Sequence, residues 1–168
     1  MLSAWICLHA PLLSPASEVL DLACGGGRHA RFLLALGHRV TLVDRDTSRV
    51  DDLRCRDDAL IITTDLEVDR WPLSASAFDA VVVTNYLYRP LFSSLLGSLR
   101  PGGLLLYETF AVGNERYGRP RNPDFLLQPG ELLELVAADF HVLAFEDLEV
   151  DQPIPAVIQH IAARKHAS

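Results

Sequence analysis

The feature that most constrains the fold is a glycine-rich turn that follows a short apolar segment near the N-terminus. Residues 18–22 have the sequence EVLDL, and residues 23–30 continue as ACGGGRHA. Glycine reaches positive φ at low cost and lets backbone N–H groups approach a ligand closely. The pattern therefore predicts a strand, a tight turn and a helix, the unit that binds nucleotide-like ligands.

Alternating apolar and amphipathic segments continue along the chain. After the first strand we expect further strands at about residues 39–43, 60–64, 78–84, 104–108, 141–146 and 157–163. We expect helices at about residues 29–36, 46–56, 91–99 and 131–139. Because the last two strands have no helix between them, one of them runs antiparallel to the rest. The order predicts an α/β fold: a Rossmann-like three-layer α/β/α sandwich with a mostly parallel seven-stranded sheet and one antiparallel C-terminal strand.

Length and composition favour one ordinary domain over residues 1–168, in which residues 1–17 form a short N-terminal lead. The net charge of −7 argues against nucleic acid or an anionic membrane as the main partner, and favours a small-molecule partner. Three cysteines without C-x-x-C spacing argue against a disulfide framework or a zinc site, so we expect no metal and a cytoplasmic protein. The apolar start has no basic residue before it, so we expect no signal peptide.

Polar residues stand at the ends of the predicted strands, where ligands bind in open α/β sheets. Asp44 follows Gly25 by 19 residues and ends the second strand, a position where an acid accepts both ribose hydroxyls; the alternative is a solvated acid. Asp65 can accept from an exocyclic adenine amine while Leu66 packs on the ring, although acids are common in loops. Asp21 orders either the ligand or only the turn.

These segments together resemble the class I S-adenosylmethionine-dependent methyltransferases, with the small bacterial tellurite-resistance-type group as the nearest subgroup. The resemblance covers roughly residues 18–110 and rests on residues 19–29, 43–44, 64–66, 78–85 and 99–103. It implies S-adenosylmethionine as cofactor and methyl transfer to an unidentified, small-molecule acceptor. It assigns Asp21, Ala23 and Gly25 to the methionine part, Asp44 to ribose, Asp65 and Leu66 to adenine, and the backbone of Asn85 to the methionine amine. Cys24, Gly26, Gly27, Arg28 and Arg45 complete the expected cofactor site.

Two departures from the family pattern concern the turn and the N-terminus. Ala23 stands where the family has its first glycine, which narrows the turn. Only 17 residues precede the first strand, where the family normally has one or more helices that close over the cofactor. We therefore expect either an open site or a natural start further upstream.

The acceptor side is expected in the loop over residues 112–129, which is longer than a simple connection requires. Glu108 and Tyr86 are the candidate catalytic residues; a salt bridge and a pocket wall are their alternative roles. His29 is a weaker candidate base. Tyr88, Arg116, Tyr117 and Arg119 are the candidate substrate-binding residues. The loop arginines and Tyr117 suit an anionic group, with a solvated basic loop as the alternative, and Tyr88 can also serve as a pocket wall.

Two other functions fit parts of the sequence. A nicotinamide-dependent oxidoreductase is possible because residues 25–30 also match G-x-G-x-x-G/A and Asp44 serves a ribose equally well. A non-catalytic cofactor-binding or regulatory module is favoured by the short N-terminal lead and by the lack of a convincing acid–base pair.

Overall fold

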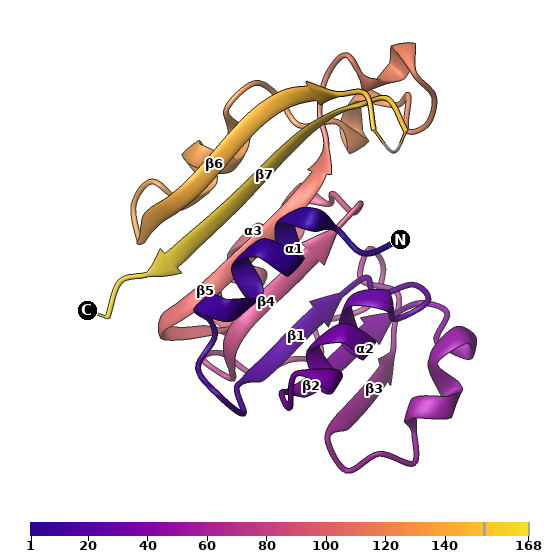
Figure 1. The fold of residues 1–168 in the computed structure, drawn as a ribbon, viewed down its shortest axis with the longest axis vertical. Coiled ribbons are helices and arrows are strands. Elements are labelled where there is room, and N and C mark those ends of the chain that lie inside the picture. Colours follow the sequence, from indigo (N-terminus) through magenta and orange to yellow (C-terminus); the bar gives the residue numbers. More distant parts are fainter. Residues whose placement is uncertain (153, 168) are drawn as a thin grey trace.

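The order of the strands places the glycine turn at the centre of the sheet. In the computed structural model, which describes residues 1–152 and 154–167, seven strands form one sheet in the order β3-β2-β1-β4-β5-β7-β6 (Figure 1). The strands are β1 (Glu18–Leu22), β2 (Arg39–Asp44), β3 (Ala59–Thr63), β4 (Phe78–Thr84), β5 (Leu99–Phe110), β6 (Phe140–Val150) and β7 (Ala156–Lys165). Because β1 pairs in parallel with both β2 and β4, the strand order reverses beside the end of β1, where ligands of such sheets bind.

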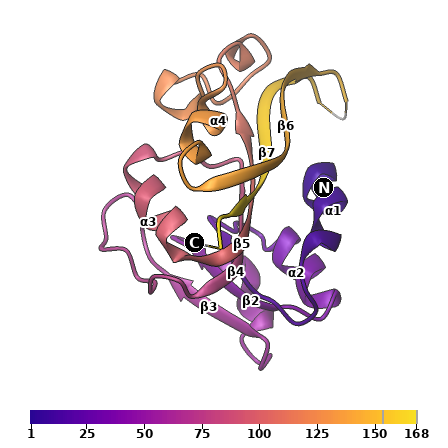
Figure 2. The same ribbon diagram turned by 90° about the vertical axis from the view of Figure 1, so that its left-hand side faces the viewer.

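Helices cover both faces of the sheet, as the three-layer prediction requires. The α-helices are α1 (Ala4–His9), α2 (Arg28–Ala35), α3 (Phe92–Ser98) and α4 (Glu131–Val136). Figure 2 shows α1 and α2 on one face and α3 and α4 on the other. Alternate residues of β5 contribute to the two cores: Leu104 and Leu106 to the cluster with α1 and α2, and Leu105 and Tyr107 to the cluster with α3 and α4.

The C-terminal strands confirm the predicted mixed sheet. β7 runs antiparallel to both of its neighbours, β5 and β6, and the other strand pairs are parallel. The strands β5, β6 and β7 are longer than the apolar segments that predicted them, since β5 already begins at Leu99 and β6 continues to Val150. These long strands carry the sheet well beyond β1, β2 and β3 at one end of the molecule (Figure 1).

The expected α-helix over residues 46–56 is wrong, because Ser48–Leu53 form a 3-10 helix instead. The side chain of Asp46 accepts a hydrogen bond from the backbone N–H of Ser48 at 3.0 Å. Such local bonds compete with the α-helical pattern, and within the 3-10 helix only Val50 and Leu53 are buried. Val50 and Leu53 are thus the two residues through which this segment packs on the rest of the protein.

The N-terminal segment packs onto the sheet through α1. Trp5 is 6% exposed and its ring stacks on that of His160 from β7, with centroids 3.7 Å apart. Ser3 caps α1 by accepting from the backbone N–H of Ile6. Of the helices within residues 1–152 and 154–167, none has the length and hydropathy needed to cross a bilayer.

Candidate functional site

The glycine turn needs its glycines for different reasons. Gly25 and Gly27 have φ of +55° and +68°, in the left-handed region. A Cβ on Gly27 would lie 2.5 Å from Cγ1 of Val50, whereas a Cβ on Gly25 would meet nothing within 4 Å. Ala23, at the place of the family's first glycine, also adopts positive φ, at 54°, and so follows the same backbone path as a glycine would. The presence of alanine instead of glycine at this position therefore leaves the backbone conformation of the turn unchanged.

Asp21 lies beneath the turn and orders it. The side chain is 1% exposed, and its Oδ2 accepts a hydrogen bond from the backbone N–H of Ala30 in the first turn of α2 at 3.0 Å. Burial raises the pKa of this carboxyl to about 7, although the bond from Ala30 and the charge of Arg28 oppose the rise. Asp21 joins β1 to α2 and does not line the cleft at the ends of β1, β2, β3 and β4. Its position favours the alternative in which it orders only the turn.

Asp44 is held at the rim by two backbone groups. Its Oδ2 accepts from the N–H of Gly25 at 2.8 Å, and its Oδ1 accepts from the N–H of Asp46 at 3.0 Å. Each carboxylate oxygen accepts more than one hydrogen bond, so both remain able to accept from a ligand hydroxyl. The turn after β1 and the end of β2 are thereby fixed to each other.

A cleft of about 440 Å³ opens at this point, along the ends of β1, β2, β3 and β4. It is lined by Ala23, Asp44, Arg45, Thr64, Asp65, Leu66, Glu67, Asn85, Tyr86 and Phe125. The structure thus brings together six of the predicted cofactor residues: Ala23, Asp44, Arg45, Asp65, Leu66 and Asn85. The lining contains three acids, Asp44, Asp65 and Glu67, and one arginine, Arg45, so its net charge is negative.

The other predicted cofactor residues lie in or behind the turn and do not line the cleft. These are Asp21, Cys24, Gly25, Gly26, Gly27 and Arg28. Cys24 is 8% exposed, and burial raises the pKa of its thiol to about 12, so it stays protonated. Gly25 does not line the cleft, but its N–H donates to the carboxylate of Asp44 and so fixes a residue that does.

Two tyrosines follow β4. Asn85, with φ of +55°, turns the chain out of the strand, and its N–H donates to the carbonyl of Glu108 on β5 at 2.9 Å. The hydroxyl of Tyr86 is buried and has no hydrogen-bond partner among the described residues. Burial, followed by the nearby carboxylates of Glu67 and Asp65, raises the pKa of this phenol, so Tyr86 is a protonated donor rather than a base.

Glu108 belongs to an ion cluster on the face of the sheet that α1 covers. His160 of β7 bonds Glu108 Oε2 through Nδ1 at 3.2 Å and Glu146 Oε2 of β6 through Nε2 at 2.7 Å. Burial lowers the pKa of His160, but the bonds to the two carboxylates outweigh it and raise the pKa overall. Glu108 does not line the cleft, and these contacts favour its alternative role as a salt-bridge residue over a catalytic one.

His29 is likewise occupied by structural contacts. Its Nε2 accepts from the backbone N–H of Ser3 at 3.1 Å, and its Nδ1 lies 3.2 Å from Oγ1 of Thr84. Burial lowers the pKa of this imidazole to about 4. His29 is thus neutral and connects the start of α1 to α2 and β4, which does not favour a role as a general base.

The first part of the loop over residues 112–129 is ordered by contacts with β6 and β7. Asn114 is buried and its Oδ1 accepts from the N–H of Val157 at the start of β7 at 3.2 Å. Arg116 and Tyr117 both bond the carboxylate of Glu149 on β6. The structure therefore directs these two predicted substrate-binding residues toward β6, and neither they nor Arg119 line the cleft.

The loop reaches the site through Phe125 and Pro120, which sequence reasoning missed. Phe125 lines the cleft and also a neighbouring pocket of about 220 Å³. That pocket is lined by Glu67, Asn85, Tyr86, Leu87, Thr109, Phe110, Pro120 and Phe125. Tyr88 lines a third pocket, of about 180 Å³, again beside Phe125. An aromatic residue within a polar, proline-containing loop was the one signal for Phe125 in the sequence.

Comparison with known proteins agrees with this arrangement. A family model described as a methyltransferase domain matches residues 19–103. The chain is 34% identical over 134 residues to a tRNA U34 carboxymethyltransferase of Methylococcus capsulatus, covering 68% of this chain and 41% of the relative. It is 28% identical over 151 residues to a malonyl-[acyl-carrier protein] O-methyltransferase of Serratia marcescens, covering 87% of this chain and 54% of the relative. The chain thus spans about half the length of these relatives.

Solved structures share the fold at low sequence identity. TehB from Haemophilus influenzae superposes with a TM-score of 0.79 at 21% identity, covering 98% of this chain and 62% of that one. A Burkholderia thailandensis 1,6-didemethyltoxoflavin-N1-methyltransferase, solved with S-adenosylhomocysteine, gives a TM-score of 0.72 at 22% identity, covering 97% and 76%. The predicted family and fold are confirmed: the chain belongs to the methyltransferase domain family, and it has the fold of S-adenosylmethionine-dependent methyltransferases.

Proposed function

We propose that this chain transfers a methyl group from S-adenosylmethionine to a small-molecule acceptor. The observation that carries the proposal is the cleft at the switch point, where Gly25 holds the carboxylate of Asp44 at the rim and Asp65 and Leu66 stand on the next strand end. In this proposal Asp44 accepts the ribose hydroxyls, Asp65 accepts the adenine amine and Leu66 packs on the adenine ring. Ala23 and Asn85 line the part of the cleft assigned to methionine.

The chain's own contribution is binding, charge and alignment. When bound, S-adenosylmethionine supplies a methyl group on a positively charged sulfur. Carboxylates at the cleft suit a cationic ligand, and the aromatic walls Tyr86 and Phe125 limit the water around it. Because holding two reactants in register supplies much of the acceleration of such a displacement, a nucleophilic side chain is not required. The protonated phenol of Tyr86 is available as a hydrogen-bond donor.

The 220 Å³ pocket beside the cleft is the proposed acceptor site. It shares Glu67, Asn85, Tyr86 and Phe125 with the cleft, so a molecule in it lies next to the cofactor position. Its described lining is mostly apolar and includes one carboxylate, Glu67, with neither arginine nor lysine. This lining favours a neutral or cationic acceptor over the anionic acceptor that the loop arginines suggested.

A tRNA acceptor is the second candidate, because the relative from Methylococcus capsulatus is named for tRNA. Nucleic-acid binding depends on neutralising phosphates with basic side chains. The net charge of −7 and the ion pair of Arg116 with Glu149 favour the small molecule. Methyl transfer to bulk tRNA, with none to a panel of small amines, phenols and heteroaromatic compounds, would reverse this preference.

Calorimetry with S-adenosylmethionine, S-adenosylhomocysteine and NADH tests the proposed cofactor. We expect both sulfur-containing ligands to bind and NADH to bind more weakly. If neither S-adenosylmethionine nor S-adenosylhomocysteine binds detectably at millimolar concentration, the proposal is contradicted. Tighter binding of NADH than of S-adenosylhomocysteine would favour the oxidoreductase alternative. Cofactor binding without transfer to any acceptor in the panel or to tRNA would favour a non-catalytic module.

A further inference from the structure

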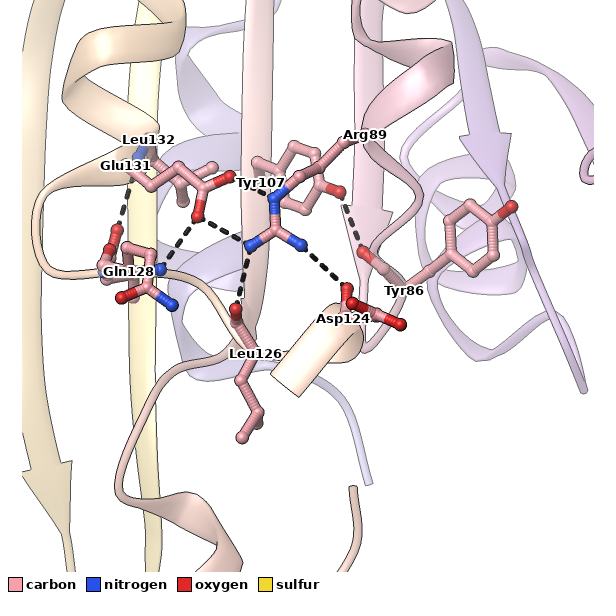
Figure 3. A network of polar contacts seen from close by, with 9 residues as sticks. Tyr86, Arg89, Tyr107, Asp124, Leu126, Gln128, Glu131 and Leu132 are labelled. Atoms are coloured by element: carbon pink, nitrogen blue, oxygen red, sulfur yellow. Dashed lines mark hydrogen bonds and ion pairs between the residues drawn. The ribbon is translucent and has the colours of Figure 1, made fainter. Parts of the chain in front are cut away.

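One arginine outside the cleft holds the loop that reaches into it. Arg89 follows β4 at the start of a 3-10 helix (Arg89–Leu91). Its Nε and Nη2 donate to the two carboxylate oxygens of Glu131, at the start of α4, at 2.6 and 2.8 Å. The same guanidinium donates to the carbonyl of Asp124 at 2.8 Å and to the carbonyl of Leu126 at 2.9 Å (Figure 3). A single side chain thus joins the segment after β4, the start of α4 and the loop.

Further contacts connect this cluster to the sheet. Glu131 also accepts from the backbone N–H of Gln128 at 2.8 Å. The carbonyl of Gln128 accepts from the side chain of Gln159 at 2.6 Å, and Gln159, fully buried on β7, also accepts from the N–H of Leu132. The partners of Arg89 are therefore also held by a buried side chain of β7.

Phe125 lies between the two carbonyls that Arg89 holds. Leu126 is 2% exposed and anchors the chain in the core, whereas Phe125 is 41% exposed. Phe125 lines the cofactor cleft, the proposed acceptor pocket and the third pocket, and is the residue that all three share. The burial of its own side chain does not fix it, so its position depends on the backbone of residues 124–126.

We propose that Arg89 is a positioning residue that fixes Phe125 as the wall shared by the cofactor cleft and the acceptor pocket. The inference rests on the proposed function, because it assigns the two cavities to cofactor and acceptor. The planar guanidinium reaches a carboxylate and two carbonyls at once, which the single ammonium of lysine does not reproduce. Arg89 itself lines neither the cleft nor the acceptor pocket and acts through Phe125.

A double-mutant cycle read out by S-adenosylhomocysteine affinity tests this coupling. We expect Arg89→Ala and Phe125→Ala each to weaken binding by about fivefold, the scale of one ordinary contact. The double variant should bind no more weakly than Phe125→Ala alone, because Arg89 has no effect once the wall is gone. Arg89→Lys, which keeps the charge, should lie between wild type and Arg89→Ala.

Arg100→Ala is the matched control for the loss of an arginine–carboxylate pair. Arg100 pairs with Asp79 at 2.7 Å, and the two line a separate pocket beside residues 12–17, away from the cleft. This variant should leave S-adenosylhomocysteine affinity within twofold of wild type. An additive double variant, or an Arg89→Ala effect no larger than that of Arg100→Ala, would overturn the inference.

A second measurement separates this inference from the proposed function. With 4-trifluoromethylphenylalanine in place of Phe125, we expect one narrow ¹⁹F resonance in the otherwise wild-type protein. In Arg89→Ala we expect a broadened resonance, displaced toward the position of the free amino acid. This readout needs no cofactor, so unchanged spectra would overturn the positioning role. If wild type bound no S-adenosylhomocysteine, the proposed function would fail, and with it the assignment of the wall.

Discussion

The two halves of the sheet hold their functional residues in different ways. Along β1, β2 and β3, the side chains at the rim are fixed by backbone groups of nearby turns, as Asp44 is by Gly25 and Asp46. Beyond β4, the loop over residues 112–129 is fixed by side-chain contacts with distant elements. Arg89 donates to the carbonyls of Asp124 and Leu126, Asn114 accepts from the N–H of Val157, and Gln159 donates to the carbonyl of Gln128. The cofactor side thus depends on local turn geometry, and the acceptor side depends on tertiary contacts.

Gly27→Ala, in the half of the sheet that depends on local turn geometry, should have the largest effect. The new Cβ would lie 2.5 Å from Val50 Cγ1 at a φ of +68°, so strain and overpacking should lower the free energy of unfolding by roughly 3 kcal/mol. Urea unfolding measures this change. Gly26→Ala is the matched control, because its Cβ would meet only Arg49 Cδ at 3.9 Å, and its unfolding free energy should stay within about 0.5 kcal/mol of wild type. Equal stabilities would show that the turn is not tightly packed.

Asp44→Ala should weaken cofactor binding while leaving the distant half intact. The loss of charge-assisted hydrogen bonds is expected to cost about 1.5–3 kcal/mol of S-adenosylhomocysteine binding, measured by calorimetry. Asp46→Ala is the control, since Asp46 is exposed and does not line the cleft. Wild-type affinity in Asp44→Ala would remove the ribose assignment.

Replacing residues 115–121 with a Gly-Ser linker should affect the acceptor half alone. Asn114 is kept, because it bonds Val157 at the start of β7. We expect S-adenosylhomocysteine affinity within about twofold of wild type, and turnover lowered about tenfold, which is about 1.4 kcal/mol of transition-state stabilisation. Turnover is measured with an acceptor found by screening. Unchanged turnover would exclude this part of the loop and leave Phe125, Tyr86 and Phe110 as candidates.

The pH dependence of stability should show the smallest effect, in the β5–β7 half. The pKa of His160 is raised in the folded protein above the ordinary value of 6.5, so its stabilising contribution is complete below pH 6.5 and is lost as pH rises through the folded pKa. In His160→Gln this pH-dependent loss of stability should be absent. The free energy of unfolding of wild type should therefore fall, relative to that of the variant, by less than about 1 kcal/mol between pH 6 and 9. Parallel pH profiles of wild type and variant in urea unfolding would contradict the assignment.

The sequence predicted the half whose contacts are local. The glycine turn, the acid 19 residues later and the Asp65–Leu66 pair follow directly from strand ends and turn chemistry, and the structure places Asp44, Asp65 and Leu66 in one cleft. Phe125 and Arg89 were missed because their partners lie on other elements: Arg89 and Glu131 are 42 residues apart. Arg116 and Tyr117 were expected at the acceptor because a loop sequence does not reveal that Glu149 of β6 is their partner.

Mapping the backbone amides that shift when S-adenosylhomocysteine is added tests the central claim most directly, because NMR reads both halves of the sheet in one measurement. We predict the largest shifts at Gly25, Asp65, Glu67 and Asn85, around the cleft at the ends of β1 to β4. Smaller shifts should reach Phe125, and amides in the middle of β6 should not move. Shifts concentrated along β6 and β7, or around residues 12–17 and 100–103 at the other pocket, would contradict the division between cofactor half and acceptor half.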